Sequence, residues 1–390
     1  MQRSLVGRLR TAVLAAALTS IPGVASAHGG IPRAFSVVVE PGGDGTRMLL
    51  RSDVFGFYHS ADSGATWSWY CAELYGESSY QAKNRTIAMA PGGKLYVAAS
   101  FNGLRTSEDL CNWSEVEEFK DLVVEHVVTT ATDVFVLTST GYSDGAGIDG
   151  RVWRSTDAGK TWAAAGEALP LNFAPASFAV APSDPGRWYV SGGKLGAGGG
   201  DAAFSSDDGG ATWTERALPA LPLGSTARIA AVHPTRPDVL VIWADLLEGL
   251  NEDKADELHL SGDGGATWKL VWKGQGDLPG FTFTPDGKQF LVGGPVDGLR
   301  VAEVDAALAE GTGAVELRLD AKIWGLRAVG TELYAGHSDF EARGKPRFTL
   351  GRSADLGVTL EGAMEICDAQ PASCPAGSTL ANACATTLDE

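Results

Sequence analysis

The sequence predicts an all-β fold, a seven-bladed β-propeller with four antiparallel strands in each blade. Three observations lead to this prediction. The 390 residues include 50 glycines and are 44% hydrophobic, a composition that favours a globular protein with many tight turns. One octapeptide motif recurs along the chain, and internal repetition is typical of repeat architectures. Between its copies the same succession of short apolar runs returns about every 50 residues, as in the blades of a propeller.

The recurring motif is S-x-D-x-G-x-T-W, called the box motif below. Its four full copies are Ser60–Trp67, Ser155–Trp162, Ser206–Trp213 and Ser261–Trp268. Two worn copies begin at Ser107 and Ser353, and the segment around Ala302 keeps similar flanks without the motif. Together these seven positions predict seven repeat units.

Each unit has the same order of predicted strands: a first apolar run, a second run, a third run that enters the motif and a fourth that leaves it at the Trp. The second runs are alternating or continuously apolar, which is typical of strands buried between neighbouring sheets. They are MLLRSDV, KLYVAAS, DVFVLTS, RWYVSGG, VLVIWAD, KQFLVGG and ELYAGHS.

With this motif the chain resembles the Asp-box (BNR-repeat) propeller superfamily, which includes sialidases, xyloglucanases, sortilin-type receptors and the photosystem II assembly factor. The resemblance covers about residues 34–366. In the motif we expect the Asp to accept backbone N–H groups, the Gly to adopt a positive φ and the Trp to lie buried between blades. The acids are therefore assigned a structural role. These residues are Asp62, Asp157, Asp208 and Asp263, with Trp67, Trp162, Trp213 and Trp268.

The ligand face of a propeller is built from the loops between second and third strands and from the links between blades. Several of these loops are long and acidic here, for example STGYSDGAGIDG and ADLLEGLNEDKAD. They fit either a solvated surface or a surface for a cation or a basic partner. The candidate residues on this face are Asp53, Phe55, Asn102, Tyr142, Asp297, His337 and Asp339.

Asp53 is the best candidate for a catalytic acid, because RSDVFGFYHS resembles the first-blade segment that carries the catalytic Asp of xyloglucanases. Glycoside hydrolysis needs a second carboxylate across the scissile bond, and xyloglucanases supply it from a second propeller. Sialidases need an arginine triad and an F/Y-R-I-P segment, where this chain reads GGIPRAF. A glycoside hydrolase-like enzyme, xyloglucanase-like or sialidase-like and centred on Asp53, is therefore the alternative function and not the first one.

The first 27 residues are typical of a signal peptide, with three arginines, an apolar run and a small-x-small site at Ala25-Ser26-Ala27. We expect a signal peptide at 1–27, the propeller at 28–366 and a cysteine-containing tail at 367–390. No later apolar run is long enough to cross a bilayer. The predicted location is therefore secreted, periplasmic or in the cell envelope.

The chain has five cysteines. Cys71 and Cys111 fall at similar places in consecutive repeats, and we predict a disulfide between them. Cys367, Cys374 and Cys384 crowd the tail, and their pairing is left open. Metal binding by these three is disfavoured because no nearby histidine completes a ligand set, so we predict no metal and no cofactor.

The formal net charge of −17 argues against a nucleic-acid partner, since binding to phosphates needs clustered Lys and Arg. The sequence therefore favours an exported binding or scaffold module that recognises a protein or a glycan without catalysis.

Overall fold

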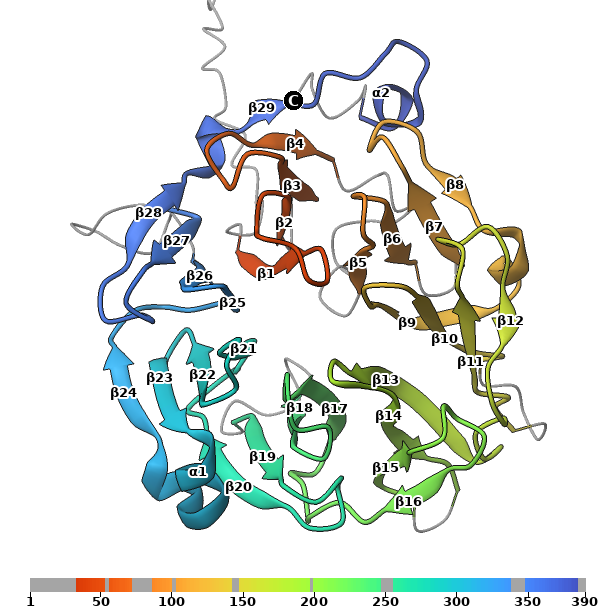
Figure 1. Cartoon of the computed structure of the whole chain (residues 1–390), viewed down its shortest axis with the longest axis vertical. Coiled ribbons are helices and arrows are strands. Elements are labelled where there is room, and N and C mark those ends of the chain that lie inside the picture. Colours follow the sequence, from red (N-terminus) through yellow and green to blue (C-terminus); the bar gives the residue numbers. More distant parts are fainter. Residues whose placement is uncertain are drawn as a thin grey trace, which may run out of the picture. The chain divides into compact units, whose positions relative to one another are not determined.

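A computed structural model of the chain describes residues 33–52, 56–71, 86–99, 103–141, 147–196, 199–246, 255–337 and 348–384. The chain divides into Met1–Gly30, which lies outside these residues, and Ile31–Glu390, which contains all of them. Within the second unit the described strands form seven sheets, each containing four consecutive strands, and the first sheet gains a fifth strand from the tail (Figure 1). Hydrogen-bonded neighbours within these four strands are antiparallel. The predicted seven-bladed propeller is confirmed.

The blades follow one another in chain order. Blades 1 to 4 comprise β1 (Ala34–Val39), β2 (Met48–Ser52), β3 (Phe57–Ser60), β4 (Ser68–Tyr70); β5 (Ile87–Met89), β6 (Leu95–Ala98), β7 (Leu104–Ser107), β8 (Ser114–Glu115); β9 (Val123–Thr129), β10 (Val134–Ser139), β11 (Arg151–Ser155), β12 (Ala163–Ala164); β13 (Phe173–Ala181), β14 (Asp184–Lys194), β15 (Asp201–Ser206) and β16 (Thr214–Arg216). Blades 5 to 7 comprise β17 (Ser225–Val232), β18 (Leu240–Leu246), β19 (Glu257–Ser261), β20 (Lys269–Lys273); β21 (Gly280–Phe283), β22 (Gln289–Gly294), β23 (Gly298–Glu303), β24 (Glu316–Leu319); β25 (Gly325–Val329), β26 (Glu332–Gly336), β27 (Leu350–Ser353) and β28 (Glu361–Met364).

The first strand of each blade lies nearest the axis of the ring (Figure 1). These inner strands contact one another around the ring, from β1 to β5 and on to β25, which returns to β1. The second strands carry most of the core, and every residue of β2, β6 and β10 is buried. Side chains from adjacent sheets pack together, as Tyr96 of blade 2 does with Val127 and Val136 of blade 3. The continuous apolar runs thus become strands sandwiched between blades, as the sequence predicts.

Blade 7 meets blade 1 at a tight seam. The N–H of Ala34 donates to the carbonyl of His337 at 3.4 Å, and Tyr334 packs in one cluster with Val37 and Leu50. A Cβ on Gly336 would stand 2.0 Å from the carbonyl oxygen of Ala34. The two backbones therefore approach so closely that only glycine fits at this position.

The C-terminal tail adds a second connection across this seam. The short strand β29 (Gln370–Pro371) pairs in parallel with β4 and becomes a fifth strand at the outer edge of blade 1. The helix α2 (Thr379–Ala383) then lies against blade 2, where the N–H of Leu380 donates to the carbonyl of Cys111 at 3.0 Å. The end of the chain thus covers the outside of the first two blades (Figure 1).

Two disulfides fix the tail in this place. Cys71 pairs with Cys384 and Cys111 pairs with Cys374, with Cα atoms 5.8 and 5.5 Å apart. The predicted bridge between Cys71 and Cys111 is therefore wrong. Each of these cysteines instead meets a tail cysteine, because the tail runs along both blades. Cys367 is an exposed free thiol.

The box motif forms the turn between the third and fourth strands. In blade 1 the Oγ of Ser60 accepts the N–H of Gly64 at 2.8 Å, and the carboxylate of Asp62 accepts the N–H and hydroxyl of Thr66 at 2.9 and 2.6 Å. Ser63 and Gly64 both have positive φ, 58° and 84°. The three other full copies repeat these bonds, and so does the worn copy at Ser353. In blade 6 the helix α1 (Val304–Glu310) follows β23 at the place of the motif.

The motif tryptophans are less uniformly buried than predicted. Trp67 is buried, as is Trp113 in the worn copy of blade 2. Trp162, Trp213 and Trp268 are half-buried. Their rings pack at the periphery against the preceding blade, as Trp162 does on Phe119 with ring centres 5.0 Å apart. The alignment of the repeats holds, but the depth of each indole depends on its neighbours.

Candidate functional site

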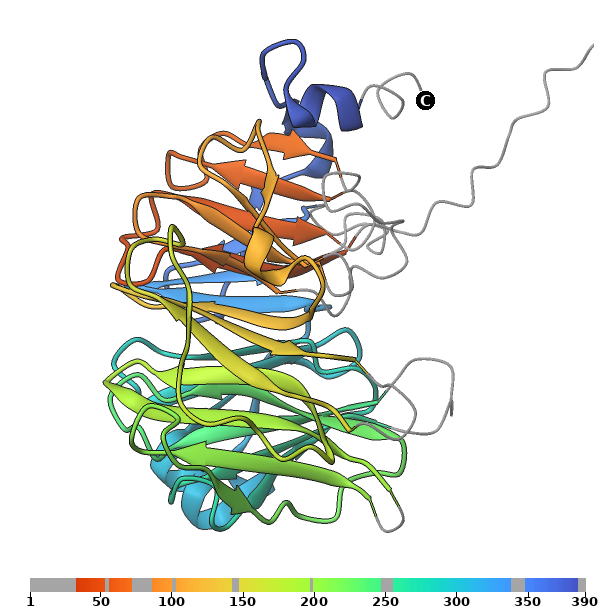
Figure 2. The same cartoon turned by 90° about the vertical axis from the view of Figure 1, so that its right-hand side faces the viewer.

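The propeller has two chemically different faces. The turns between first and second strands and the box turns lie on one face, called the box face. The turns between second and third strands and the links between blades lie on the other, called the loop face, since the strands alternate in direction (Figure 2). Asp297 and His337, the two predicted ligand-binding candidates that the structure describes, lie on the loop face.

The other five candidates lie outside the described residues, and their roles stay predictions. They are Asp53, Phe55, Asn102, Tyr142 and Asp339. Two others, Asp297 and His337, are described, and both are buried.

The carboxylate of Asp297 in blade 6 accepts hydrogen bonds from blade 5 and from the link that follows it. It accepts the indole N–H of Trp272 at 3.1 Å and the backbone N–H of Gln275 at 2.9 Å. These bonds hold the link from blade 5 against the turn between β22 and β23. His337 packs its ring on Phe348, with ring centres 5.1 Å apart, and its backbone joins Ala34 and Thr349. In the described structure both residues position loops.

Charged groups on the inner strands, which the sequence pattern did not predict, form a second set of polar contacts. The guanidinium of Arg228 on β17 pairs with Asp245 of β18, with Nε and Oδ2 3.1 Å apart, and also donates to the carbonyl of Ala176 at 3.0 Å. Glu125 of β9 accepts the hydroxyl of Ser139 at 2.7 Å. Burial raises the pKa of Glu125, against the opposing effects of Ser139 and Arg228. In the sequence these groups show only as charged residues inside short strands that are otherwise largely apolar.

His126 stands next to Glu125 and is held neutral. Its Nδ1 accepts the N–H of Phe178 at 2.8 Å, so the proton of the ring is on Nε2. Desolvation, with a further contribution from Arg228, lowers the pKa of His126 to about 3. A group with this pKa is a weak base at neutral pH, and the bond to Phe178 gives it a structural role between blades 3 and 4.

The same bond recurs around the ring. Thr86 accepts the N–H of Val127, and Ser177 accepts the N–H of Ile229. In blade 7 the equivalent residue is Arg327 of β25, and no side chain of the described residues bonds to it. The residue is exposed. Desolvation by the surrounding protein lowers the pKa of its guanidinium.

Asp256, directly before β19 on the loop face, is a carboxyl group with a strongly raised pKa. It accepts the N–H groups of Leu246 and Leu278 and the indole N–H of Trp243, at 2.8 to 3.0 Å. Desolvation outweighs these bonds and raises its pKa to about 6. Because three donors already fill its oxygens, the carboxylate fastens the end of β18 to the link between blades 5 and 6.

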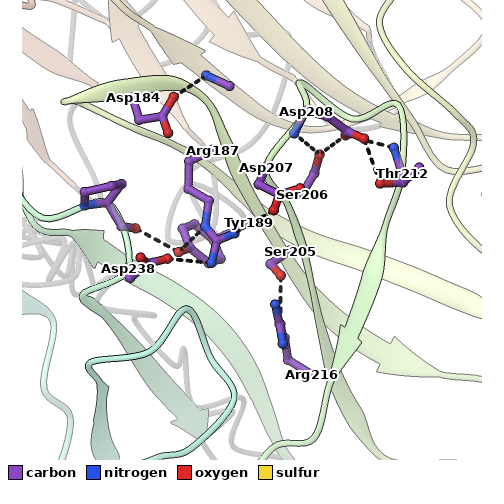
Figure 3. Close-up of polar contacts among 12 residues, drawn as sticks. Asp184, Arg187, Tyr189, Ser205, Ser206, Asp207, Asp208, Thr212, Arg216 and Asp238 are labelled. Atoms are coloured by element: carbon purple, nitrogen blue, oxygen red, sulfur yellow. Dashed lines mark hydrogen bonds and ion pairs between the residues drawn. The ribbon is translucent and has the colours of Figure 1, made fainter.

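On the box face the charges join neighbouring blades. Figure 3 shows Arg187 of β14 bonded to Tyr189 at 2.8 Å and paired with Asp238 of blade 5 at 2.6 Å. In the same view the carboxylate of Asp208 is occupied by Ser206 and Thr212 of its own turn. Hydrogen bonds from Thr66 and Ser60 likewise lower the pKa of Asp62 to about 2. In the described blades the motif acids are therefore consumed by the turns they form.

The loop face also exposes apolar side chains and hollows. Leu171, Leu223 and Val296 are 59%, 86% and 59% exposed and lie in links or turns of this face. Two cavities of about 520 and 340 Å³ flank the link that carries Leu223. No cluster of three or more metal-ligating side chains and no membrane-spanning helix occurs in the part of the chain that the structure describes.

Residues 150–288 match the family described as "Sortilin, neurotensin receptor 3". The match runs from the third strand of blade 3 to the turn before the second strand of blade 6, and so spans three of the box motifs. The chain fits the Asp-box propeller superfamily. No curated protein matches the sequence.

Among solved structures, hydrazine synthase from Kuenenia stuttgartiensis is 12% identical and has a TM-score of 0.51, covering 79% of this chain and 94% of that one. The GH74 xyloglucanase from Xanthomonas campestris is 16% identical with a TM-score of 0.47, covering 85% and 68%. YCF48 from Cyanidioschyzon merolae is 14% identical with a TM-score of 0.40, covering 67% and 92%. These identities concern the fold alone. The function must therefore be argued from this chain's own surface.

Proposed function

We propose that the protein is an exported binding module that docks a protein partner on its loop face. The observation that carries the proposal is the 86% exposure of Leu223 between two cavities. A large aliphatic side chain held in water costs free energy that a partner surface recovers by covering it.

The exposed apolar groups are distributed around this face. Leu171 lies in the link from blade 3 to blade 4, Leu223 in the next link and Val296 in the turn between β22 and β23. Of the five large apolar side chains that stand out as exposed in the described structure, these three share one face. Several exposed apolar side chains on one face suit contact with another protein's surface.

The link that carries Leu223 is also stiff. It reads Leu218-Pro219-Ala220-Leu221-Pro222-Leu223, and each proline fixes one φ angle. The hydroxyl and N–H of Ser225 bond to the carbonyl of Pro222 at 2.8 and 3.1 Å, which anchors the end of the link. A preorganised loop loses little conformational entropy on binding. Among the described residues, the exposed apolar side chains of this face are aliphatic, which suits a protein surface better than the stacking of a sugar ring.

The disulfides support an extracellular or periplasmic location, since such bridges persist in oxidising compartments. The net charge of −17 further favours a partner with a basic or neutral docking surface.

A photo-cross-linking amino acid at position 223 tests the proposal in envelope extracts of the source cells. We expect a discrete protein adduct from position 223 and from position 296. The matched control is position 358, which is 50% exposed on the box face and should give no such adduct. Leu223→Asp should abolish the adduct from position 296 by placing a charge in the interface.

Equal adducts from both faces would contradict the loop face as the docking surface. Turnover of xyloglucan or a sialoside that disappears in Asp53→Asn would instead establish the hydrolase alternative, because an amide can neither accept the proton nor attack the sugar.

A further inference from the structure

The chain itself shows how the outer edge of a blade takes up an additional strand. In blade 1 the N–H groups of Gln370 and Ala372 donate to the carbonyls of Trp67 and Trp69, both at 3.0 Å. Gln370 and Pro371 thereby lie in register with Ser68 and Trp69 as a parallel strand. The two accepting carbonyls belong to the motif Trp and to the residue two positions after it.

Blade 3 has the same edge in the same register. Its motif Trp is Trp162, and Ala164 is two positions further on. Ala164 lies opposite Trp153, as Trp69 lies opposite Tyr58. The N–H of Ala165 donates inward to Val152 at 2.8 Å, so the polar groups of Ala164 point outward, since successive residues of a strand alternate.

A groove runs along this edge. A cavity of about 610 Å³ is lined by Trp162, Ala163, Ala164 and Gly166 on the side of blade 3, and by Gly186 and Asp208 on the side of blade 4. Ala163, Ala164 and Gly166 are exposed. The space is several times the volume of one side chain, and no element of the described structure fills it.

The strand β12 also lacks the charged side chains that discourage another strand from pairing with an exposed edge. Natural edge strands carry charged side chains that prevent strand addition. Such residues occur in the outer strands of the other blades that have no covering tail: Glu215 and Arg216 in β16, Lys269 and Lys273 in β20, Glu316 and Arg318 in β24, and Glu361 in β28. In contrast, β12 consists of two alanines.

The tail already covers the two preceding blades. The strand β29 lies on blade 1, and α2 lies on the box turn of blade 2. There the N–H of Trp113 donates to the hydroxyl of Thr379 at 3.3 Å, and that hydroxyl donates to the carbonyl of Trp113 at 3.4 Å. Blade 3 is the next position along this path, and none of the tail residues that the structure describes reaches it.

We propose that the groove beside β12 binds an extended peptide segment of a partner protein, which adds to β12 as a fifth, parallel strand. Its N–H groups bond to the carbonyls of Trp162 and Ala164, and alternate side chains face the half-buried indole of Trp162. This site lies at the outer edge of the ring and is separate from the loop-face surface of the proposed function.

A displayed library of random nonapeptides, selected on the wild-type protein, provides the probe. Ala164→Pro removes the outward N–H and crowds the edge, and proline is tolerated at such a place in an edge strand. Fluorescence anisotropy of a selected peptide should show binding at least 10-fold weaker to Ala164→Pro than to wild type. The matched control is Glu215→Pro, which makes the same change at the equivalent position of blade 4 and should leave the affinity unchanged.

A second measurement uses only the wild-type protein. N-methylation of the selected peptide should weaken binding at every other residue, because alternate N–H groups face the strand. Failure to select any binding peptide, equal affinity for both proline variants, or an effect of N-methylation without this alternation would overturn the proposal. Cross-linking from position 223 is unaffected by either result, so the two binding surfaces are tested separately.

Discussion

Removal of the two tail disulfides perturbs the closure of the ring in a way that can be calculated. We consider three variants: Cys71→Ser with Cys384→Ser, Cys111→Ser with Cys374→Ser, and all four changes together. The bridges span 313 and 263 residues. With one bridge in place, the second closes a loop of only about 50 residues, made of the 40 between Cys71 and Cys111 and the 10 between Cys374 and Cys384.

The entropy of loop closure then gives the magnitudes. A loop of about 50 residues corresponds to roughly 4 kcal/mol at 25 °C, and a loop of about 260 to 310 residues to roughly 5.6 kcal/mol. Each paired variant should therefore lose at most about 4 kcal/mol of unfolding free energy, because the remaining bridge still closes the ring. Loss of both bridges should cost about 10 kcal/mol, more than twice the single effect.

Guanidinium unfolding, followed by tryptophan fluorescence under non-reducing conditions, measures these differences. Mass spectrometry of the paired variants confirms that the remaining bridge is formed. A quadruple variant that is no less stable than either paired variant would refute the idea that the two bridges jointly close one ring.

Three further outcomes follow from the packing and the charges. Gly336→Ala should destabilise the seam by at least about 2 kcal/mol in guanidinium unfolding, because its Cβ would stand 2.0 Å from the Ala34 carbonyl oxygen. Gly193→Ala is the matched control, since nothing lies within 4 Å of that Cβ, and it should have wild-type stability. Trp67→Ala should cost about 3 to 5 kcal/mol in chemical denaturation, because this indole is fully packed; an effect below 1 kcal/mol would contradict its assigned place in the core. Folding raises the pKa of Asp256 from 3.8 to about 6, so the folded state keeps this proton to a higher pH than the unfolded state does. The unfolding free energy should therefore fall by roughly 3 kcal/mol through this group as the pH rises from 4 to 6. Asp256→Asn should remove that fall from the pH dependence of unfolding.

The blades could be predicted from the sequence because each is built from contiguous residues. The box turn closes within eight positions, so Ser60, Asp62 and Thr66 show both the turn and its place in the strand order. The partners of Cys71 and Cys111 could not be predicted in this way. They depend on the path of a tail more than 260 residues away, and repeat symmetry suggested the wrong pair.

The ligand-binding role of the loop-face candidates stays a prediction. Loop position placed Asp297 in the turn between β22 and β23 but did not predict its burial, since burial by neighbouring links is decided by tertiary packing. The inner-strand charges were missed because Glu125 and Arg228 interrupt apolar runs without any local motif. Their partners come from adjacent strands and from Ala176 of the neighbouring blade, and such contacts leave no trace in the spacing of residues.

Hydrogen exchange of the protein alone and in complex with the cross-linked partner tests the docking surface most directly. The account predicts slower exchange on the loop face, at residues 170–172, 222–225 and 295–298, which surround Leu171, Leu223 and Val296. Exchange in the box turns at 61–66 and 353–359 should not change. Protection confined to the box turns, with the loop face as fast as in the free protein, would contradict the assignment of the loop face as the binding surface.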